Sequence, residues 1–470
     1  DPLPDESADL LRERARATPE ATALVDADEG TTWTYEAFDR LVDDLAGGLL
    51  AHLKLDGRRI GLLLPTGPSF ATAYFALARR NGIAVPLNRR ESADTVAKQS
   101  ERADLVAVLC AEETESMARA VAPPDATVLT VDEPVTGDVA EIEPTTDDGL
   151  ARTADGETER LVLFTSGTTG EPKGVRLTRG NLVASAVGSA ARLGVTAGDR
   201  WLVCLPMYHM GGLAPLVRST LYGTTTVIQQ SFEASETAQT LDEASITGVS
   251  IVPTMLTRLL DDGWRPPETL RFVLLGGAPA RPDMIERSEE AGVPVFPTYG
   301  TTETASQITT ATPAEAFARP ETVGRPIEGT NVTVRDGGTT CAPGEVGELV
   351  VSGPTVTPGY LDERQTAEAF EDDGFHTGDL GYRDGDGRYF VVGRVDDQIV
   401  TGGENVQPAV VRQALEDLQT VAEAAVVGLP DEEWGQRVAA AVVPATETTP
   451  QDVIDAVSDS LADFAVPKTV

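Results

Sequence analysis

The most informative segment of the chain is Leu161-Val162-Leu163-Phe164-Thr165-Ser166-Gly167-Thr168-Thr169-Gly170-Glu171-Pro172-Lys173-Gly174-Val175. Its apolar first part predicts a buried strand, which ends in hydroxyl and glycine residues followed by one lysine. Glycines let backbone N–H groups approach an anion, hydroxyls add donors, and the lysine adds charge. We therefore predict a loop that binds polyphosphate through Thr165, Ser166, Gly167, Thr168, Thr169 and Lys173.

This loop differs from the P-loop pattern GxxxxGK[ST], because Pro172 precedes the lysine and Gly174 follows it. A flexible linker rich in serine, threonine and glycine is the structural alternative. Such a linker rarely follows an apolar strand directly and then leads into another apolar run. We therefore favour the phosphate-binding interpretation.

Helix and strand patterns alternate on both sides of this loop. The sequence predicts helices at 34–53, 69–80 and 254–260, and strands at 59–65, 83–87, 105–109, 250–252 and 270–275. This alternation is typical of βαβ units, whose parallel strands are covered by helices on both faces. The acidic stretch 132–159 is predicted to be an exposed loop.

The pattern changes near residue 330. Short strands at 331–334, 347–351 and 387–392 predict a small β-rich subdomain, and a helix near 408–418 with strands at 424–427 and 438–443 predicts an α+β domain. We expect an α/β fold with a large N-terminal domain of parallel-sheet subdomains plus the β-rich subdomain, residues 1–394. A small mobile α+β C-terminal domain, residues 395–470, follows.

The charge of the chain is strongly acidic. The 470 residues carry a formal net charge of −38, and only four of the 37 basic residues are lysines. Such a surface argues against nucleic acid or anionic lipid as the main partner. We interpret the excess of acid together with the loss of lysine as adaptation to a very salty cytoplasm, where self-repulsion is screened. An ordinary acidic protein is the alternative.

Cysteine and histidine are scarce and scattered. The three cysteines and three histidines form no CxxC pair or zinc-ligand spacing, which excludes a disulfide framework and a structural zinc site. This usage predicts a reducing, cytoplasmic location. The sequence contains no apolar run of about 18 or more residues, so we predict no membrane span. The first residues, Asp1-Pro2-Leu3-Pro4-Asp5, resemble a trimmed start without a signal segment.

The segment from Thr165 to Gly174 resembles the phosphate loop of the adenylate-forming superfamily, which includes acyl-CoA synthetases, luciferases and peptide-synthetase adenylation domains. Further motifs follow in the order of that superfamily and extend the resemblance over nearly the whole chain. They are Gly276-Gly277-Ala278, Thr298-Tyr299-Gly300-Thr301-Thr302-Glu303, Thr377-Gly378-Asp379, Gly393-Arg394-Val395-Asp396 and Gly402-Gly403-Glu404-Asn405-Val406.

The resemblance implies a role for each motif. Gly276, Gly277, Ala278 and the residues Thr298, Tyr299, Gly300, Thr301 and Thr302 would bind adenine, Asp379 the ribose hydroxyls, and Arg394 phosphate or ribose oxygen. Glu303 would be the Mg²⁺ ligand, since this hard cation prefers carboxylate and phosphate oxygens. Asp396 would be the hinge, and Gly402, Gly403 and Glu404 the loop that joins the site for the CoA step. Structural alternatives are core packing for Tyr299, a turn for Asp379 and a surface ion pair for Arg394.

The implied reaction uses ATP, Mg²⁺ and CoA with a small-molecule carboxylic acid. The carboxylate attacks the α-phosphorus of ATP, and CoA then displaces AMP, with Lys173, Glu303 and His209 as catalytic candidates. Relatives carry a catalytic lysine near the C-terminus, whereas this chain stops at Pro467-Lys468-Thr469-Val470, before that motif. We therefore expect the chain, as it stands, to adenylate poorly.

Two segments bear on the identity of the acid. Pro206-Met207-Tyr208-His209-Met210-Gly211-Gly212-Leu213, with Arg218 beyond it, and Thr302-Glu303-Thr304-Ala305-Ser306-Gln307 look closest to o-succinylbenzoate–CoA ligases of menaquinone synthesis. That acid carries a second carboxylate, so its pocket needs cationic or donor groups. We predict His209, Arg218, Ser306 and Gln307 as substrate-binding residues. Arg218 as an exposed helix residue is the alternative, and His209 fits a gate common to many relatives.

Other functions stay open at this point. An aryl- or fatty-acyl-CoA synthetase is the alternative within the same class, and a peptide-synthetase adenylation domain is less favoured because no carrier domain follows. A non-catalytic nucleotide-binding relative is the alternative from another class, although the phosphate loop and Glu303 are intact. Whether the chain forms a homo-oligomer is also open.

Overall fold

The computed structural model describes residues 9–137, 139–145, 155–165, 172–401, 404–431, 434–458 and 460–470, with Asn405 described by its backbone alone. The chain divides into two compact units. The first comprises Asp1–Asn331 and Ser352–Asp373, and the second comprises Val332–Val351 and Gly374–Val470. The predicted boundary between 394 and 395 stays a prediction.

One sheet of the first unit carries the polyphosphate-loop segment. Its strand order is β20 (Gly359–Tyr360), β9 (Lys173–Thr178), β8 (Glu159–Thr165), β4 (Ile83–Pro86), β3 (Arg59–Leu63), β5 (Ala107–Cys110), β6 (Thr127–Thr130) and β7 (Ala140–Glu141). From β8 to β7 neighbouring strands are parallel, as predicted. Strand β9 is antiparallel to β8, because the connection between them is too short for a crossover. Strand β20 pairs antiparallel with β9.

The second sheet of this unit also has a parallel central part with antiparallel strands at its edges. Its order is β16 (Arg325–Pro326), β15 (Thr309–Thr310), β14 (Val295–Tyr299), β13 (Phe272–Leu275), β12 (Gly248–Ile251), β10 (Arg200–Val203), β11 (Thr225–Ile228), β1 (Thr22–Asp26) and β2 (Thr32–Thr34). The strands from β14 to β1 are parallel. Their carboxyl ends therefore lie at one edge of the sheet, where ligands of open α/β sheets bind.

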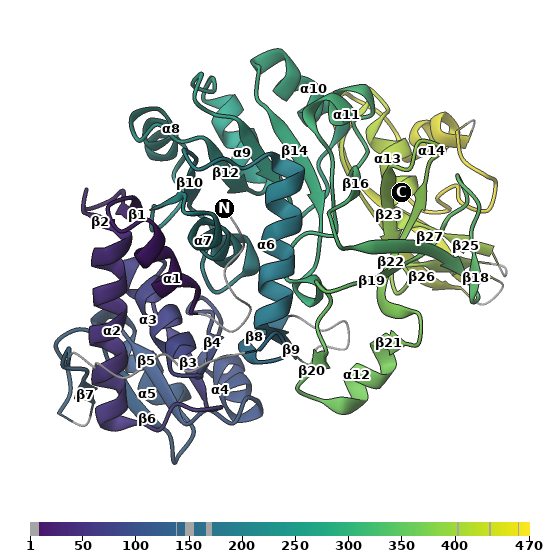
Figure 1. The fold of residues 1–470 in the computed structure, drawn as a ribbon. Coiled ribbons are helices and arrows are strands. Elements are labelled where there is room, and N and C mark those ends of the chain that lie inside the picture. Colours follow the sequence, from purple (N-terminus) through teal and green to yellow (C-terminus); the bar gives the residue numbers. More distant parts are fainter. Residues whose placement is uncertain are drawn as a thin grey trace. The chain divides into compact units, whose positions relative to one another are not determined.

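Helices cover the faces of both sheets (Figure 1). The helices of this unit are α1 (Leu10–Ala17), α2 (Tyr35–His52), α3 (Pro68–Arg79), α4 (Ala93–Arg102), α5 (Glu115–Val121), α6 (Arg179–Leu193), α7 (Met210–Tyr222), α8 (Ala234–Glu243), α9 (Pro253–Asp261), α10 (Pro282–Ala291), α11 (Pro313–Ala318) and α12 (Glu363–Ala369). The unit also contains the short 3₁₀ helices η1 (Glu112–Thr114) and η2 (Thr302–Thr304) and the strand β21 (Phe370–Glu371). Helix α2 begins where the Thr34 hydroxyl accepts a hydrogen bond from the Ala37 N–H. Its buried Phe38, Val42 and Leu49 lie on one helical face.

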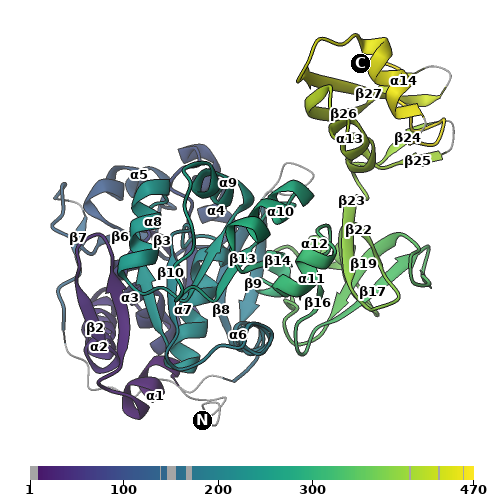
Figure 2. The same ribbon diagram turned by 90° about the horizontal axis from the view of Figure 1, so that it is seen from above.

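The second unit contains two antiparallel sheets. One is formed by β18 (Thr339–Thr340), β17 (Asn331–Asp336), β19 (Gly347–Ser352), β22 (Gly374–Arg383) and β23 (Tyr389–Arg394). The other is formed by β25 (Glu404–Val406), β24 (Ile399–Thr401), β27 (Gly435–Pro444) and β26 (Val421–Asp431), with helices α13 (Pro408–Glu416) and α14 (Pro450–Ser458) beside it (Figure 2). The prediction of β-rich structure followed by α+β structure is confirmed.

Two local expectations need comment. The stretch 132–159, predicted as a loop, contains the short strand β7, and residues 146–154 lie outside the described part of the chain. Among the described helices, none combines the length and the apolar character needed to cross a bilayer.

Candidate active site

The described ends of the polyphosphate segment lie on β8 and β9. Thr165 at the end of β8 pairs with Lys173 at the start of β9, so the two ends of the predicted loop are held side by side. Ser166, Gly167, Thr168 and Thr169 lie outside the described residues. At Gly174, a Cβ atom would lie 2.6 Å from Cδ1 of Leu361, so a larger residue would require the Leu361 side chain to move.

One tyrosine, Tyr360, contacts both Lys173 and the predicted metal ligand Glu303. The Lys173 ammonium lies 5.2 Å from the ring centroid of Tyr360, and the Tyr360 hydroxyl donates a 2.8 Å hydrogen bond to Oε1 of Glu303. The other carboxylate oxygen of Glu303 has no hydrogen-bond or ion-pair partner among the described residues. A half-buried carboxylate with one oxygen available suits a hard divalent cation.

The two predicted adenine-binding segments follow neighbouring strands. Gly276 follows β13 and Thr298 lies near the end of β14, and these strands pair in parallel. A Cβ atom on Gly276 would lie 2.7 Å from Cγ2 of Thr298, so the close approach requires glycine. Gly277 has a φ of 80°, a conformation that glycine adopts without strain. Ala278 follows as an exposed residue.

The segment after β14 is tightly folded back on itself. A Cβ atom on Gly300 would lie 1.7 Å from the carbonyl oxygen of Ser306. Ser306 itself has a φ of 128°, a strained value for a residue with a side chain. The Thr301–Thr304 capping pair forms η2, with Thr302 at its first position. Tyr299 is half-buried at the end of β14.

Gln307 lies buried at the end of this segment. Its Nε2 atom donates a 2.6 Å hydrogen bond to Oγ1 of Thr310. Its Oε1 atom has no hydrogen-bond partner in the described part of the molecule. A buried unsatisfied carbonyl oxygen is uncommon and calls for a ligand or water.

Helix α7 carries the other two predicted substrate residues. His209 is the exposed residue that precedes α7, and its ring lies 4.7 Å from the ring of Tyr208. Desolvation lowers the pKa of His209, because the imidazolium is poorly solvated there, and the charge of Glu91 only partly opposes this.

Arg218 lies two and a half turns further along α7, and only 3% of its surface is exposed. The alternative that Arg218 is an exposed helix residue is wrong. Its guanidinium carbon lies 4.5 Å from the ring centroid of Trp201 on β10. Its Nε and Nη1 atoms have no hydrogen-bond partner within the described ranges. Burial lowers its pKa to about 10, and Tyr222 opposes this only weakly.

The remaining predicted nucleotide residues belong to the second unit. Asp379 on β22 pairs with Arg394 on β23, and Nη1 of Arg394 donates a 2.5 Å hydrogen bond to Oδ1 of Asp379. Gly378 has a φ of 70° within β22, where the register between β19 and β22 is irregular. Sequence reasoning did not predict that these two candidate ligands pair with each other.

The side chain of Glu348 on β19 contacts this part of β22. Its Oε1 atom accepts a 2.9 Å hydrogen bond from the Gly378 N–H, and its Oε2 atom lies 2.8 Å from Nδ1 of His376. Glu348 was not singled out from the sequence, because a glutamate in an alternating strand gives no local signal of such a contact.

The hinge and CoA-loop candidates lie further along the second unit. Asp396 is exposed just after β23. Glu404 pairs with Thr401 in the β24–β25 hairpin, whereas Gly402 and Gly403 between them lie outside the described residues.

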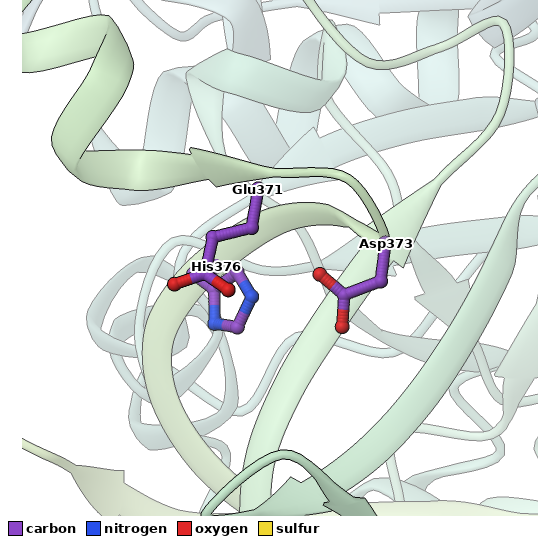
Figure 3. Close-up of side chains that lie close together, drawn as sticks. All are labelled: Glu371, Asp373 and His376. Carbon is purple, nitrogen blue, oxygen red and sulfur yellow. The ribbon is translucent and has the colours of Figure 1, made fainter.

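A further group of potential ligands lies at the turn between β21 and β22. Figure 3 shows the side chains of Glu371, Asp373 and His376 close together there. The division between the two units falls inside this turn, after Asp373. We assign no metal to this group.

The family of the chain follows from its sequence. The profile of the family described as AMP-binding enzyme matches residues 11–361, and that of the AMP-binding enzyme C-terminal domain matches residues 411–470. The chain belongs to the AMP-binding enzyme family. The predictions of the adenylate-forming superfamily, of its fold class and of an ATP-dependent, AMP-forming acid–CoA ligase family are thereby confirmed.

Curated and solved relatives of this AMP-binding enzyme extend over most of its length. It is 35% identical over 462 residues to the 2-succinylbenzoate–CoA ligase of Bacillus cereus, covering 97% of this chain and 92% of that protein. The o-succinylbenzoate CoA synthetase of Bacillus subtilis in complex with the acyl-adenylate OSB-AMP superposes with a TM-score of 0.87 at 33% identity, covering 98% of this chain and 94% of that one. The same Bacillus subtilis enzyme in complex with ATP and magnesium gives the same TM-score of 0.87, identity of 33% and coverages of 98% and 94%.

Proposed function

We propose that this adenylate-forming CoA ligase acts on o-succinylbenzoate, in a step of menaquinone synthesis. The observation that carries the proposal is the burial of Arg218, whose Nε and Nη1 atoms have no hydrogen-bond partner among the described residues. A buried cation without a counter-ion costs free energy that a bound anion recovers. The distal carboxylate of o-succinylbenzoate supplies such an anion at the far end of the acid from its reacting group.

Trp201 positions the Arg218 guanidinium for this role. The ring of Trp201 stacks on that of Phe272 at 5.2 Å and donates through Nε1 to Oγ of Ser250 at 3.3 Å, so it is fixed from two sides. An aromatic face supports a guanidinium without neutralising it. The charge of Arg218 therefore stays available for a substrate carboxylate.

Further buried polar groups lie along the neighbouring helix α6. Oγ of Ser185 donates to the Ala305 carbonyl and Nε of Arg192 donates to the Thr310 carbonyl, so α6 runs along the segment that carries Ser306 and Gln307. Ser189 lies on the same helical face between them, and its Oγ atom has no partner in the described chain. We assign Ser306, Gln307 and Ser189 to the polar lining of the acid pocket.

The first half-reaction follows from the charges. A carboxylate oxygen of the acid bonds to the α-phosphorus of ATP while the bond to the β-phosphate oxygen breaks, and pyrophosphate leaves. Lys173 would neutralise phosphate charge, and Thr165 with Ser166, Gly167, Thr168 and Thr169 would donate hydrogen bonds to the phosphates. Glu303 would hold Mg²⁺, which supplies charge neutralisation to the phosphate oxygens. Gly276, Gly277, Ala278, Thr298, Tyr299, Gly300, Thr301 and Thr302 would form the adenine site, with Asp379 and Arg394 on ribose and phosphate.

The second half-reaction forms the thioester. The CoA sulfur bonds to the acyl carbon, the bond to the AMP oxygen breaks, and the thiol proton passes to solvent or a base. We assign His209, at the exposed start of α7, to the entrance of the acid pocket. Asp396 is the proposed hinge, and Glu404 with Gly402 and Gly403 is the proposed loop of this step.

The test is a comparison of acids with the native protein in high KCl, ATP, Mg²⁺ and CoA. AMP and thioester formation would be measured with o-succinylbenzoate, benzoate, coumarate and medium-chain fatty acids. We expect a kcat/KM for o-succinylbenzoate at least about 100-fold above the others, since a site that hydrogen-bonds a charged group rejects ligands that lack it. Preference for an aryl or fatty acid would contradict the assignment of o-succinylbenzoate as the substrate. ATP binding without turnover of any acid would favour a non-catalytic relative.

A further inference from the structure

Strand β20 connects the two charged residues of the predicted phosphate and metal site. It pairs antiparallel with β9, with Tyr360 opposite Val175. The Leu361 N–H donates to the Gly174 carbonyl at 2.8 Å. On the other side, the Thr357 N–H donates to the Glu303 carbonyl at 2.7 Å. The backbone around Tyr360 is therefore attached both to the strand of Lys173 and to the turn of Glu303.

The Tyr360 side chain repeats this connection. Its hydroxyl donates to Oε1 of Glu303 and its ring face lies beneath the Lys173 ammonium. Tyr360 is only 3% exposed. Lys173 has no carboxylate partner among the described residues, so the ring supports the ammonium while leaving its charge for phosphate.

The position of Tyr360 is fixed by its neighbours. Its N–H donates to Oγ1 of Thr366 at 2.9 Å, and its ring packs edge-on against Phe370 at 6.0 Å. Gly359 before it has a φ of 136°, and a Cβ atom there would lie 2.5 Å from Cγ2 of Thr366. The ring and hydroxyl can therefore not follow Glu303 if that side chain moves.

The acceptor distinguishes this hydroxyl from those of two other buried tyrosines, Tyr35 and Tyr389. Tyr389 donates to the Val332 carbonyl at 2.6 Å, and Tyr35 donates to the Ser219 and Thr224 carbonyls. Those contacts satisfy a buried hydroxyl and join elements of the core. Tyr360 instead donates to an ionisable carboxylate, which fixes the rotamer of that carboxylate and directs its other oxygen away from the ring.

We propose that Tyr360 is a positioning residue of the adenylation site, which orients the Glu303 carboxylate toward Mg²⁺ through its hydroxyl and holds the Lys173 ammonium through its ring. The proposal rests on the proposed function, because it requires Glu303 and Lys173 to serve the metal and the phosphates. It assigns two separable contributions to one side chain. The hydroxyl strengthens nucleotide binding only when Mg²⁺ is present. The ring strengthens nucleotide binding whether or not Mg²⁺ is present.

The test is calorimetric titration of the native protein with α,β-methylene-ATP, first with Mg²⁺ and then with EDTA. The ratio of the two dissociation constants is the gain in affinity due to the metal, and it needs no turnover. We expect Tyr360→Phe to lower this gain about tenfold and to leave binding in EDTA unchanged, because one hydrogen bond to a charged group is lost. Tyr360→Leu, which also removes the ring, should in addition weaken binding in EDTA about threefold.

Two controls separate positioning from structure. Tyr389→Phe removes an equally buried hydroxyl bond and should leave both dissociation constants unchanged. Glu303→Gln should abolish most of the gain. If wild type shows the metal gain and Tyr360→Phe retains it in full, the positioning role is wrong while the proposed function stands. If wild type binds no nucleotide under either condition, the proposed function fails and the role of Tyr360 fails with it.

Discussion

Two buried arginines of the first unit differ in their surroundings. Arg79, at the end of α3, has a fully buried side chain that contacts the carboxylates of Asp9 at 2.7 Å, of Asp43 at 2.8 Å, and of Asp39. Arg218, on α7, is just as deeply buried and stacks on Trp201, with no carboxylate bonded to its Nε and Nη1 atoms among the described residues.

The pKa values follow this difference. Burial alone would lower the pKa of Arg79, but Asp9 and then Asp39 and Asp43 outweigh it and hold the pKa above its usual value. At Arg218 burial prevails and lowers the pKa to about 10. The first arginine has its counter-ions within the chain and joins α1, α2 and α3. Arg218 has no counter-ion among the residues that the structure describes, which is why we assign its counter-ion to the substrate.

The largest effect is expected from Arg79→Met. The change removes the one cation that contacts all three carboxylates, and Arg12 still contacts Asp39 and Asp43 but not the Asp9 carboxylate oxygen that Arg79 binds. The free energy of unfolding should therefore fall by about 3–5 kcal/mol. Urea unfolding would measure it. The control is Arg16→Met, whose partner Glu13 and own side chain are 42% and 67% exposed, and which should cost at most about 0.5 kcal/mol. Equal losses in the two variants would show that the Arg79 cluster is not structural.

A smaller effect is expected on the KM for o-succinylbenzoate, which should rise as the pH is raised. A substrate carboxylate binds the protonated Arg218, whose pKa of about 10 means that the protonated fraction falls above this pH. The KM for o-succinylbenzoate should therefore rise about fourfold between pH 9 and pH 10.5. The KM for 4-oxo-4-phenylbutanoate, which lacks the distal carboxylate, should not rise in parallel. The ratio of the two KM values is the measurement, and a ratio that stays flat would contradict a role for Arg218.

The sequence predicted the fold well where a repeating pattern exists. The apolar runs of β3, β4, β12 and β13 and the amphipathic helix α2 were predicted to within a few residues. The antiparallel edge formed by β9 and β20 was not predicted, because β20 has two residues and no alternation. Salt adaptation, drawn from composition alone, stays a prediction.

The site was predictable where glycine and hydroxyl residues gather, and not where contacts are distant in sequence. Tyr360 and Glu303 are 57 residues apart, so no local pattern indicates their hydrogen bond. The burial of Arg218 did have a signal. Residues such as Leu213, Leu216 and Leu221 place apolar side chains around much of α7, and a helix without a polar face is buried.

The most direct test of the account combines two proteins and two acids. Wild type and Arg218→Met would be compared with o-succinylbenzoate and with 4-oxo-4-phenylbutanoate, with urea unfolding as a check on folding. The variant should raise the KM for o-succinylbenzoate about 10- to 100-fold, change that for the analogue less than about twofold, and leave stability within about 1 kcal/mol. Equal changes for both acids, or no change for either, would contradict the assignment of the distal carboxylate to Arg218.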